Sequence, residues 1–225
     1  MRRLLIVALL FSTTLKADVL LTDSFDGSSI DASKWNVNLP FGTSQAYLSN
    51  GKFVTYDRGI ITSTATFNPY VQPYVVEGVF TPENWNTVFC VTLRSNGALD
   101  IPSSESLGIR VGFWSSASPG VTINPVFMNA TGSGVSALPA LPNGTPYAFA
   151  ITDFGSKISV AINGTEVLIA DISDYTFGGS ISLFSSYQYG LNNVENIKVT
   201  SVPEPSSLSL LVLGGAVVVL RRRKK

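Results

Sequence analysis

The 225-residue chain contains no histidine and a single cysteine, Cys90. The lack of histidine excludes Ser-His-Asp and Cys-His catalytic arrangements and removes the most frequent zinc ligand. One cysteine cannot form a disulfide within the chain, so a hydrophobic core alone must hold the folded part together. Cys90 lies in NTVFCVTL among β-branched and aromatic residues. This setting predicts a buried strand thiol without the cationic neighbour that a reactive thiol requires.

Charged residues are scarce, at 13% of the chain, and they are unevenly distributed. The formal net charge is zero, but eight of the 15 basic residues lie in the first 16 or the last five positions. Residues 18–202 keep seven basic and 14 acidic residues, which gives this body a net charge of −7. Phosphate binding requires clustered cations, so this charge argues against nucleic acid as a partner.

Between Asp18 and Val202 no window shows a sustained 3.6-residue apolar repeat, which argues against amphipathic helices. Short alternating segments bounded by turn residues recur instead, and they predict strands. The predicted strands lie at residues 18–25, 45–49, 52–57, 59–67, 73–81, 86–94, 107–115, 121–128, 147–153, 156–162, 165–170, 179–186 and 194–201. About a dozen strands in one body of this length predict an all-β fold, a two-sheet antiparallel sandwich of jelly-roll type.

Two Asn-Gly pairs predict tight hairpins, because Asn and Gly accept the positive φ angles that such turns require. They are Asn50-Gly51 in YLSNGKFVTY and Asn163-Gly164 in KISVAINGTEVLIA. The second pair belongs to residues 147–170, which predict an antiparallel meander of three strands. The residues expected to face one side of this meander are Ile158, Val160, Ile162, Val167 and Ile169. The stretch 129–146, rich in Gly, Ser, Ala and Pro, predicts a long surface loop.

The N-terminal stretch MRRLLIVALLFSTTLKA has the three parts of a secretory signal peptide. Arg2 and Arg3 precede an apolar run, and Ala17 ends a short polar stretch, so cleavage is expected after Ala17. The alternatives are a buried strand or an uncleaved anchor, but the apolar run is too short to span a bilayer. The sequence therefore predicts export through the Sec machinery.

The C-terminal stretch is VPEPSSLSLLVLGGAVVVLRRRKK. Pro203, Glu204 and Pro205 precede an apolar segment over residues 206–220. The segment ends at the basic residues Arg221, Arg222, Arg223, Lys224 and Lys225. A helix of this segment would measure roughly 22 Å, which is shorter than the ~30 Å hydrocarbon core of a bilayer. The sequence predicts a short transmembrane helix whose basic stems snorkel to the cytoplasmic headgroups.

This combination of motif, apolar segment and basic end resembles the PEP-CTERM sorting signal of Gram-negative bacteria. The resemblance implies recognition by an exosortase, a pause in the inner membrane, removal of the tail, and release to the cell surface or extracellular matrix. A permanent tail anchor is the alternative interpretation. It would give the same orientation, but it would not require the proline-flanked glutamate.

The opening DSFDGSSIDASKWNV and the closing meander resemble concanavalin A-like lectin/glucanase domains, including laminin-G-like ones. The resemblance implies a β-sandwich domain over residues 18–201, between a signal peptide at 1–17 and a sorting signal at 202–225. Glucanases of this fold use closely spaced carboxylates in the pattern E-x-D-x-x-E, and glycoside hydrolysis needs two carboxylates at the bond. No such pattern occurs in the chain, so we expect a protein that is not an enzyme.

A structural or adhesive role is therefore expected, with carbohydrate binding as the alternative and glycoside hydrolysis as a remote one. Sugar sites combine an aromatic platform with amide or carboxylate groups, and an extracellular polysaccharide is the partner that such a site would imply. The candidate residues are Trp85, Trp114, Tyr187, Tyr189 and Asn192. Packing in the core or at the sheet rim is the alternative for each aromatic residue. The stretch SYQYGLNN is expected to connect the last two strands.

Related sandwiches often bind calcium, and Asp23, Asp26 and Asp31 supply oxygen atoms near the start of the body. They lack the fixed ligand spacing of a calcium loop, so a turn built on Asp and Gly is the favoured interpretation. No metal site and no cofactor are otherwise predicted.

Overall fold

The computed structural model describes residues 17–83, 87–96, 108–115, 120–126, 135–137, 142–172, 178–185 and 191–203. Within these ranges the chain forms strands, turns and connections. The strands are β1 (Val19–Asp23), β2 (Trp35–Asn38), β3 (Gln45–Ser49), β4 (Lys52–Tyr56), β5 (Ile60–Ser63), β6 (Tyr74–Pro82), β7 (Thr87–Ser95), β8 (Gly108–Ser115), β9 (Gly120–Val126), β10 (Val135–Ala137), β11 (Tyr147–Asp153), β12 (Lys157–Ile162), β13 (Thr165–Asp171), β14 (Ser180–Ser185) and β15 (Leu191–Ser201).

The two predicted terminal segments fall largely outside the described ranges. The signal peptide up to Lys16 and the tail from Glu204, with its apolar segment and basic end, are not described. In the part of the chain that is described, no helix has the length and hydropathy needed to cross a bilayer.

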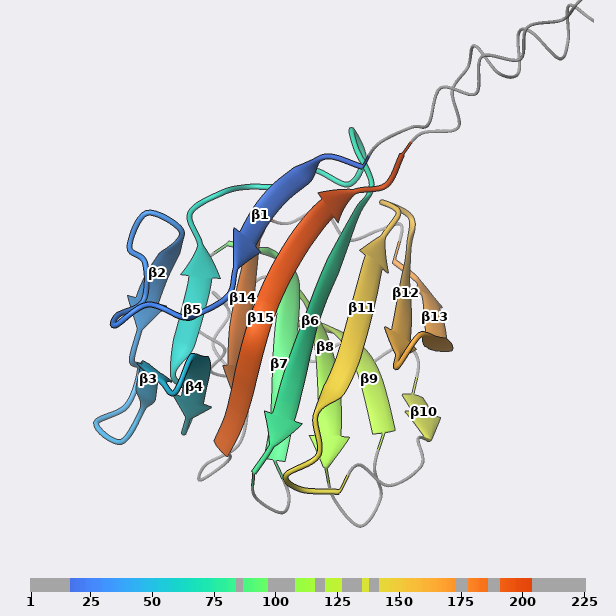
Figure 1. Cartoon of the computed structure of the whole chain (residues 1–225). Helices are drawn as coiled ribbons and strands as arrows, with labels where there is room; N and C mark the ends of the chain where they lie inside the picture. The colour runs from blue at the N-terminus through green and yellow to red at the C-terminus, as the bar shows by residue number, and fades with distance from the viewer. Residues whose placement is uncertain are drawn as a thin grey trace, which may run out of the picture. The chain divides into compact units, whose positions relative to one another are not determined.

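The strands form two antiparallel sheets that face each other (Figure 1). The eight-stranded sheet has the order β13-β12-β11-β6-β15-β4-β3, and β1 pairs with the second half of β15. The seven-stranded sheet has the order β10-β9-β8-β7-β14-β5-β2. This arrangement confirms the predicted all-β fold, a two-sheet antiparallel sandwich of jelly-roll type.

An aromatic cluster fills the space between the two sheets. Phe80 of β6 and Phe149 of β11 come from one sheet, and Phe89 of β7 and Phe113 of β8 from the other. Their ring centroids lie 5.0 to 6.1 Å apart. Contacts at these separations stabilise aromatic pairs by about 0.5–1.5 kcal/mol beyond the burial of their area. These rings point into the space between the sheets because side chains alternate along each strand, so the neighbours of each ring point to the other face.

The opposite face of the seven-stranded sheet carries a second, smaller apolar cluster. It consists of Ile60 of β5, Val88 and Cys90 of β7, and Phe184 of β14, all nearly fully buried. Cys90 takes part in no disulfide and has no exposed surface. The prediction of a buried strand thiol is therefore confirmed.

Both predicted Asn-Gly hairpins are present. Asn50 and Gly51 have φ angles of 52° and 70° between β3 and β4. Asn163 and Gly164 have φ angles of 48° and 77° between β12 and β13. The second hairpin completes the β11-β12-β13 meander, which the sequence also predicts correctly.

The facing of β13 differs from the prediction. The register between β12 and β13 shifts at Val160/Ala161, so Val160 pairs with Leu168 and Ile158 pairs with Ala170. Ile169 pairs with Ser159 and is exposed on the outer face, so the expectation that it faces the core is wrong. Because side chains alternate with a period of two, one extra residue at a bulge moves every later side chain to the other face. Val167, which lies at the shift between Glu166 and Leu168, packs against the core as expected.

Three further boundaries differ from the prediction. β2, of four residues, was not predicted, because WNVN is shorter than the alternation needed to recognise a strand. β10 occupies three residues within the predicted loop 129–146 and pairs with β9. β15 begins at Leu191, three residues before the predicted start. All three lie at strand ends or sheet edges, where the sequence pattern is weakest.

The register defines two opposite ends of the sandwich. At the end that we call the tail end, Ser201 pairs with Tyr74, and Tyr74 pairs with Asp153. At the other end, which we call the Asn192 end, Asn192 pairs with Pro82. β15 runs from the Asn192 end to the tail end across the middle of the eight-stranded sheet (Figure 1).

Candidate functional site at the Asn192 end

A buried polar network joins the two sheets at the Asn192 end. The Asn192 side chain donates from Nδ2 to Ser185 Oγ at 3.2 Å and accepts from Thr87 Oγ1 at 3.3 Å. Thr55 Oγ1 accepts from the Ser185 backbone N–H at 3.2 Å and donates to the carbonyl oxygen of Gly59 at 2.6 Å. These polar side chains are almost fully buried, and their mutual hydrogen bonds offset the cost of removing them from water.

A second set of contacts surrounds this network. Asn193 Nδ2 donates to Glu83 Oε1 at 2.6 Å, and the Glu83 backbone N–H donates to the carbonyl oxygen of Leu191 at 3.0 Å. Within the described ranges, the buried Thr81 Oγ1 has no hydrogen-bond partner. The Asn192 end therefore combines tightly bonded amides with an unsatisfied hydroxyl.

Of the predicted sugar-binding residues, the structure describes Asn192 and the backbone of Trp114 at this end. Trp85 lies between Glu83 and Thr87, and Tyr187 and Tyr189 lie between Ser185 and Leu191, outside the described residues. The backbone of Trp114 pairs with Val88, the residue after Thr87. Asn192 hydrogen-bonds to Thr87 and Ser185, the described residues that lie next in sequence to these undescribed segments.

The position of Asn192 itself differs from the sequence interpretation. It belongs to β15 and not to a connection, and its side chain has no exposed surface. It therefore links the first residue of β7 to the last residue of β14, and it offers no exposed amide to a ligand in this structure.

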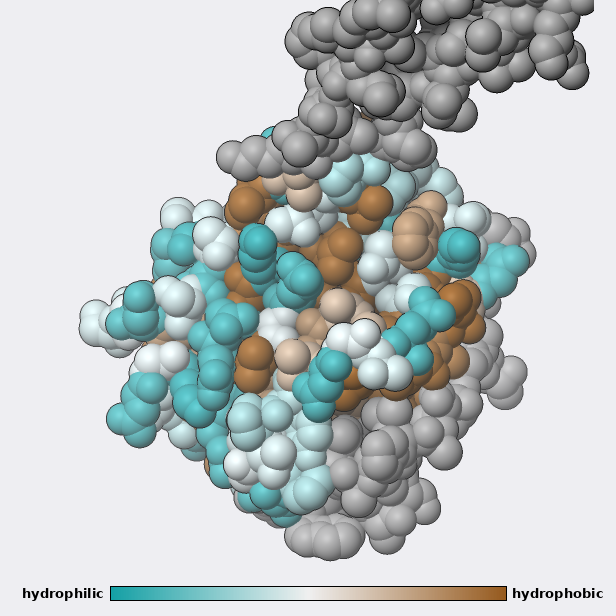
Figure 2. All heavy atoms as spheres, turned by 45° about the vertical axis from the view of Figure 1, so that its right-hand side comes forward, coloured by the Kyte–Doolittle hydropathy of each residue, from teal (hydrophilic) through white to brown (hydrophobic). Residues whose placement is uncertain are grey.

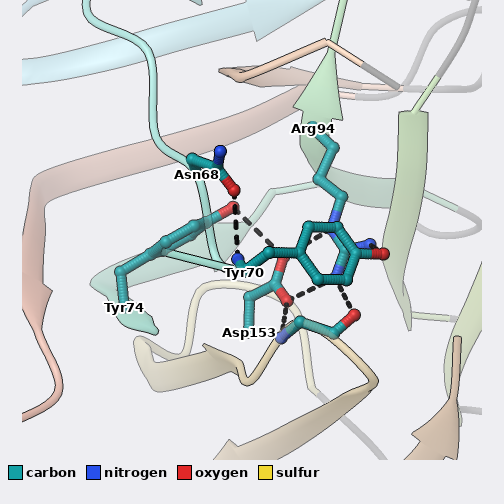
Figure 3. A network of polar contacts seen from close by, with 6 residues as sticks. Asn68, Tyr70, Tyr74, Arg94 and Asp153 are labelled. Atoms are coloured by element: carbon teal, nitrogen blue, oxygen red, sulfur yellow. Dashed lines mark hydrogen bonds and ion pairs between the residues drawn. The ribbon is translucent and has the colours of Figure 1, made fainter. Parts of the chain in front are cut away.

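A second buried polar network, which sequence reasoning missed, lies at the tail end (Figure 3). Arg94 of β7 forms an ion pair with Asp153 of β11, with Nη2 2.6 Å from Oδ1 and Nε 2.9 Å from Oδ2. Arg94 also donates to the carbonyl oxygen of Gly155 at 2.7 Å and to the Tyr70 hydroxyl at 2.9 Å. The Tyr74 hydroxyl donates to Asp153 Oδ2 at 3.3 Å. The pair connects the two sheets through charge-assisted hydrogen bonds.

The electrostatics of this pair favour a permanently charged arginine. Burial alone would lower the pKa of Arg94, but the hydrogen bonds and negative charge of Asp153 outweigh it and raise that pKa. Burial, together with the negative charge of Asp153, raises the pKa of the Tyr74 hydroxyl well above its ordinary value. Both groups thus keep their protons over the physiological pH range, which suits a structural clamp and not an acid–base pair.

A third group of polar side chains lies on the outer face of the seven-stranded sheet, beside the apolar cluster of Ile60, Val88, Cys90 and Phe184. Ser182 Oγ lies 2.8 Å from Thr62 Oγ1 and donates to Ser95 Oγ at 2.9 Å. Arg110 lies over the ring of Phe184, 5.9 Å from its centroid. The side chains described on this face include Ile60, Thr62, Val88, Cys90, Thr92, Arg110, Ser182 and Phe184, and none of these is a carboxylate.

Two of the three acids considered for calcium, Asp23 and Asp31, have other partners. Asp23 accepts from Trp35 Nε1 at 2.7 Å and from the Phe25 backbone N–H at 3.0 Å. The Ser33 hydroxyl and backbone N–H donate to Asp31, and these hydrogen bonds lower the pKa of that carboxyl. Over the described ranges, no group of three His, Cys, Asp or Glu residues lies close enough together to hold a metal ion. Asp23 and Asp31 act here as turn and core acceptors.

Comparison with solved structures places the fold among concanavalin A-like and galectin-like sandwiches of the glucanase type. One similar structure is a protein of unknown function with a galectin-like fold from Bacillus subtilis, with a TM-score of 0.66 and 13% identity over 84% of this chain and 100% of that one. Another is the β-glucanase of Bacillus licheniformis, with a TM-score of 0.58 and 10% identity over 80% and 96%. A third is the CBM2 module of the evolved Dit protein of Lactobacillus casei BL23 phage J-1. Its TM-score is 0.62 and its sequence identity is 10%, over 84% of this chain and 97% of that one.

The C-terminal segment gives the more particular match. Residues 201–224 match the PEP-CTERM protein-sorting motif, which confirms the resemblance of Pro203, Glu204, Pro205 and the basic end to that signal. The motif marks an exported protein that is sorted toward the cell surface through a membrane-anchored stage. No curated protein matches the chain.

Proposed function

We propose that the protein is a non-catalytic β-sandwich that is exported, processed by an exosortase, and displayed at the surface or in the extracellular matrix of a Gram-negative bacterium. Its role there is structural or adhesive. The observation that carries this proposal is the sorting motif at residues 201–224, because it assigns a destination and not a reaction. The signal peptide that ends at Ala17 supplies the entry into the Sec pathway.

The chemistry of the described residues supports a role without catalysis. Glycoside hydrolysis needs two carboxylates on either side of the scissile bond. The buried acids Asp23 and Asp153 accept hydrogen bonds from Trp35 and Arg94, respectively. The side chains named above on the outer face of the seven-stranded sheet supply hydroxyls and a cation but no carboxylate for the acid or nucleophile role in glycoside hydrolysis.

Carbohydrate binding is the second candidate, and it is favoured by the hydrogen bonds of Asn192. Asn192 hydrogen-bonds to Thr87 and Ser185, the strand ends next to Trp85 and to Tyr187 and Tyr189. A pre-organised sugar platform requires rigid strand ends next to its aromatic residues, and this buried network would supply them. The fold likeness to the CBM2 module and the β-glucanase agrees with this candidate.

Mass spectrometry of the protein released by its native host tests the sorting proposal. The expected C-terminus lies near Pro203, Glu204 and Pro205, without the five basic residues. A secreted protein that retains RRRKK would refute processing by an exosortase.

A glycan array with the processed protein separates the two candidate roles. Saturable binding that is lost in Trp114→Ala or Tyr187→Ala, but kept in Tyr47→Ala, would establish carbohydrate binding. Tyr47 is a suitable control because it is an exposed tyrosine on the edge strand β3. Absence of binding to every glycan would leave the structural role. Release of reducing ends from β-glucans or alginate would refute a non-catalytic function.

A further inference from the structure

Five large apolar side chains are exposed at the tail end of the sandwich. Their exposed fractions are 56% for Val19, 36% for Leu20, 50% for Tyr70, 73% for Val71 and 38% for Phe154. The register places all five at this end. Val19 pairs with Thr200, Tyr70 and Val71 shortly precede Tyr74, and Phe154 follows Asp153. Exposed apolar side chains that gather in one place indicate a contact surface, whereas scattered ones need no explanation.

The aromatic members of this surface are held in place. The Tyr70 ring lies over the Arg94 guanidinium, 4.9 Å from its Cζ, and its hydroxyl accepts a hydrogen bond from Arg94 Nη1 (Figure 3). The Tyr70 backbone N–H donates to Asn68 Oδ1 at 3.1 Å. Lys157 Nζ lies 5.2 Å from the centroid of the Phe154 ring. Each aromatic ring is therefore exposed beside a cation, and Tyr70 is fixed by the buried ion pair.

The sequence connects this end directly to the sorting tail. β15 ends at Ser201, and only residues 202–205 separate it from the apolar segment that starts at Ser206. A fully extended chain covers at most about 18 Å over this distance. While the apolar segment is in a bilayer, the tail end of the sandwich must therefore lie close to the headgroups.

We propose that the tail end of the sandwich rests on the lipid bilayer during the membrane-anchored stage, with Val19, Leu20, Tyr70, Val71 and Phe154 in the interface. This inference rests on the proposed function, because it requires the tail to be inserted. Tyrosine and other aromatic rings favour the headgroup level, and the Lys157 stem can reach lipid phosphates while its apolar part stays below. In Figure 2 brown hydrophobic surface lies near the upper end of the sandwich, which is the tail end in Figure 1, and also across the middle and right of this face.

Depth-dependent fluorescence quenching tests this proposal. Chains of residues 18–225 carrying Val71→Cys or Thr165→Cys are labelled with a fluorophore and reconstituted into liposomes of phosphatidylethanolamine and phosphatidylglycerol. Thr165 is the matched control, because it is an exposed residue in the β12-β13 hairpin, at the end of β12 opposite the Phe154 turn. Cys90 is fully buried, so the label reacts at the introduced cysteine. Lipids with a quencher near the headgroups should reduce the fluorescence at position 71 by about twofold more than at position 165, because interfacial contacts reach ~5–10 Å into the bilayer.

The outcomes separate this inference from the proposed function. Chains that float with the liposomes but show equal quenching at both positions would overturn the interfacial contact and leave the sorting proposal intact. Chains that do not float would refute insertion of the tail, and with it both proposals. Quenching at position 71 that appears only in membranes containing an exosortase would identify a protein partner in place of lipid and overturn the proposal.

Discussion

The buried ion pair between Arg94 and Asp153 allows a direct test of the structure. We consider Asp153→Asn, which keeps the shape of the side chain and removes its charge. In the native protein Asp153 Oδ1 and Oδ2 accept hydrogen bonds from Arg94 Nη2 and Nε. Both side chains are almost fully buried, with 1% of Arg94 and none of Asp153 exposed. The substitution therefore leaves an uncompensated guanidinium charge between the two sheets.

The expected loss of stability follows from this burial. Removing one partner of a buried ion pair costs about 3–5 kcal/mol, because the remaining charge is cut off from water. The exposed pair Lys52–Glu195 provides a matched control. Its Nζ–Oε1 distance of 2.8 Å is similar to the 2.6 Å of the buried pair, but 34% and 37% of its side chains are exposed. Lys52→Ala should cost no more than about 1 kcal/mol, because solvent screens an exposed pair.

Urea unfolding at neutral pH, followed by tryptophan fluorescence, measures both losses. Trp35 is a suitable reporter, since it is buried against Phe25 with ring centroids 6.1 Å apart. The double variant Arg94→Met/Asp153→Leu should be no less stable than the single Asp153→Asn, because it removes both charges together. Equal losses for Asp153→Asn and Lys52→Ala would refute the argument that burial determines the strength of the pair.

Three further predictions concern single residues. The raised pKa of Tyr74 means that the unfolded chain releases this proton near pH 10 and the folded chain does not. Stability should therefore fall as the pH rises above about 10, and Tyr74→Phe should flatten that decline in urea midpoints. In Gly78→Ala the new Cβ would lie 2.5 Å from the Asn196 carbonyl oxygen, so a loss of about 1–3 kcal/mol is expected in the same assay, and an unchanged midpoint would contradict the β6–β15 packing. Gly164→Ala meets no atom within 4 Å but keeps a φ of +77°, so a thermal melt should show only the ~1 kcal/mol cost of that backbone strain.

Much of the fold could be predicted from the sequence, because strand alternation and turn chemistry are local. The meander 147–170 combines a regular two-residue pattern with an Asn-Gly turn, and both parts are confirmed. The facing of Ile169 could not be predicted, since a bulge leaves no mark in the pattern of apolar residues. The short edge strands β2 and β10 could not be predicted for a related reason. Their formation depends on pairing with β5 and β9 more than on the pattern of their own residues.

The polar networks were less accessible to sequence reasoning. Arg94 and Asp153 are 59 residues apart, and only the folding of two sheets onto each other brings them together. A weak indication was present, because each is a charged residue near the end of an otherwise apolar strand, in VFCVTLRS and YAFAITD. The sequence indicates Asn192 as a sugar-binding residue because its amide lies near two tyrosines in the chain. In the structure β15 extends beyond its apolar pattern and buries that amide.

The course of β15 has a mechanical consequence. This strand carries the sorting tail at one terminus and Asn192 at the other, and it pairs with β6 along most of its length. A pull between an anchored tail and a partner held at the Asn192 end would act parallel to the strand. The hydrogen bonds of an antiparallel pair lie perpendicular to the strands, so such a load would shear many bonds at once and would not open them one after another. The sandwich is thus built to transmit tension along its central strand.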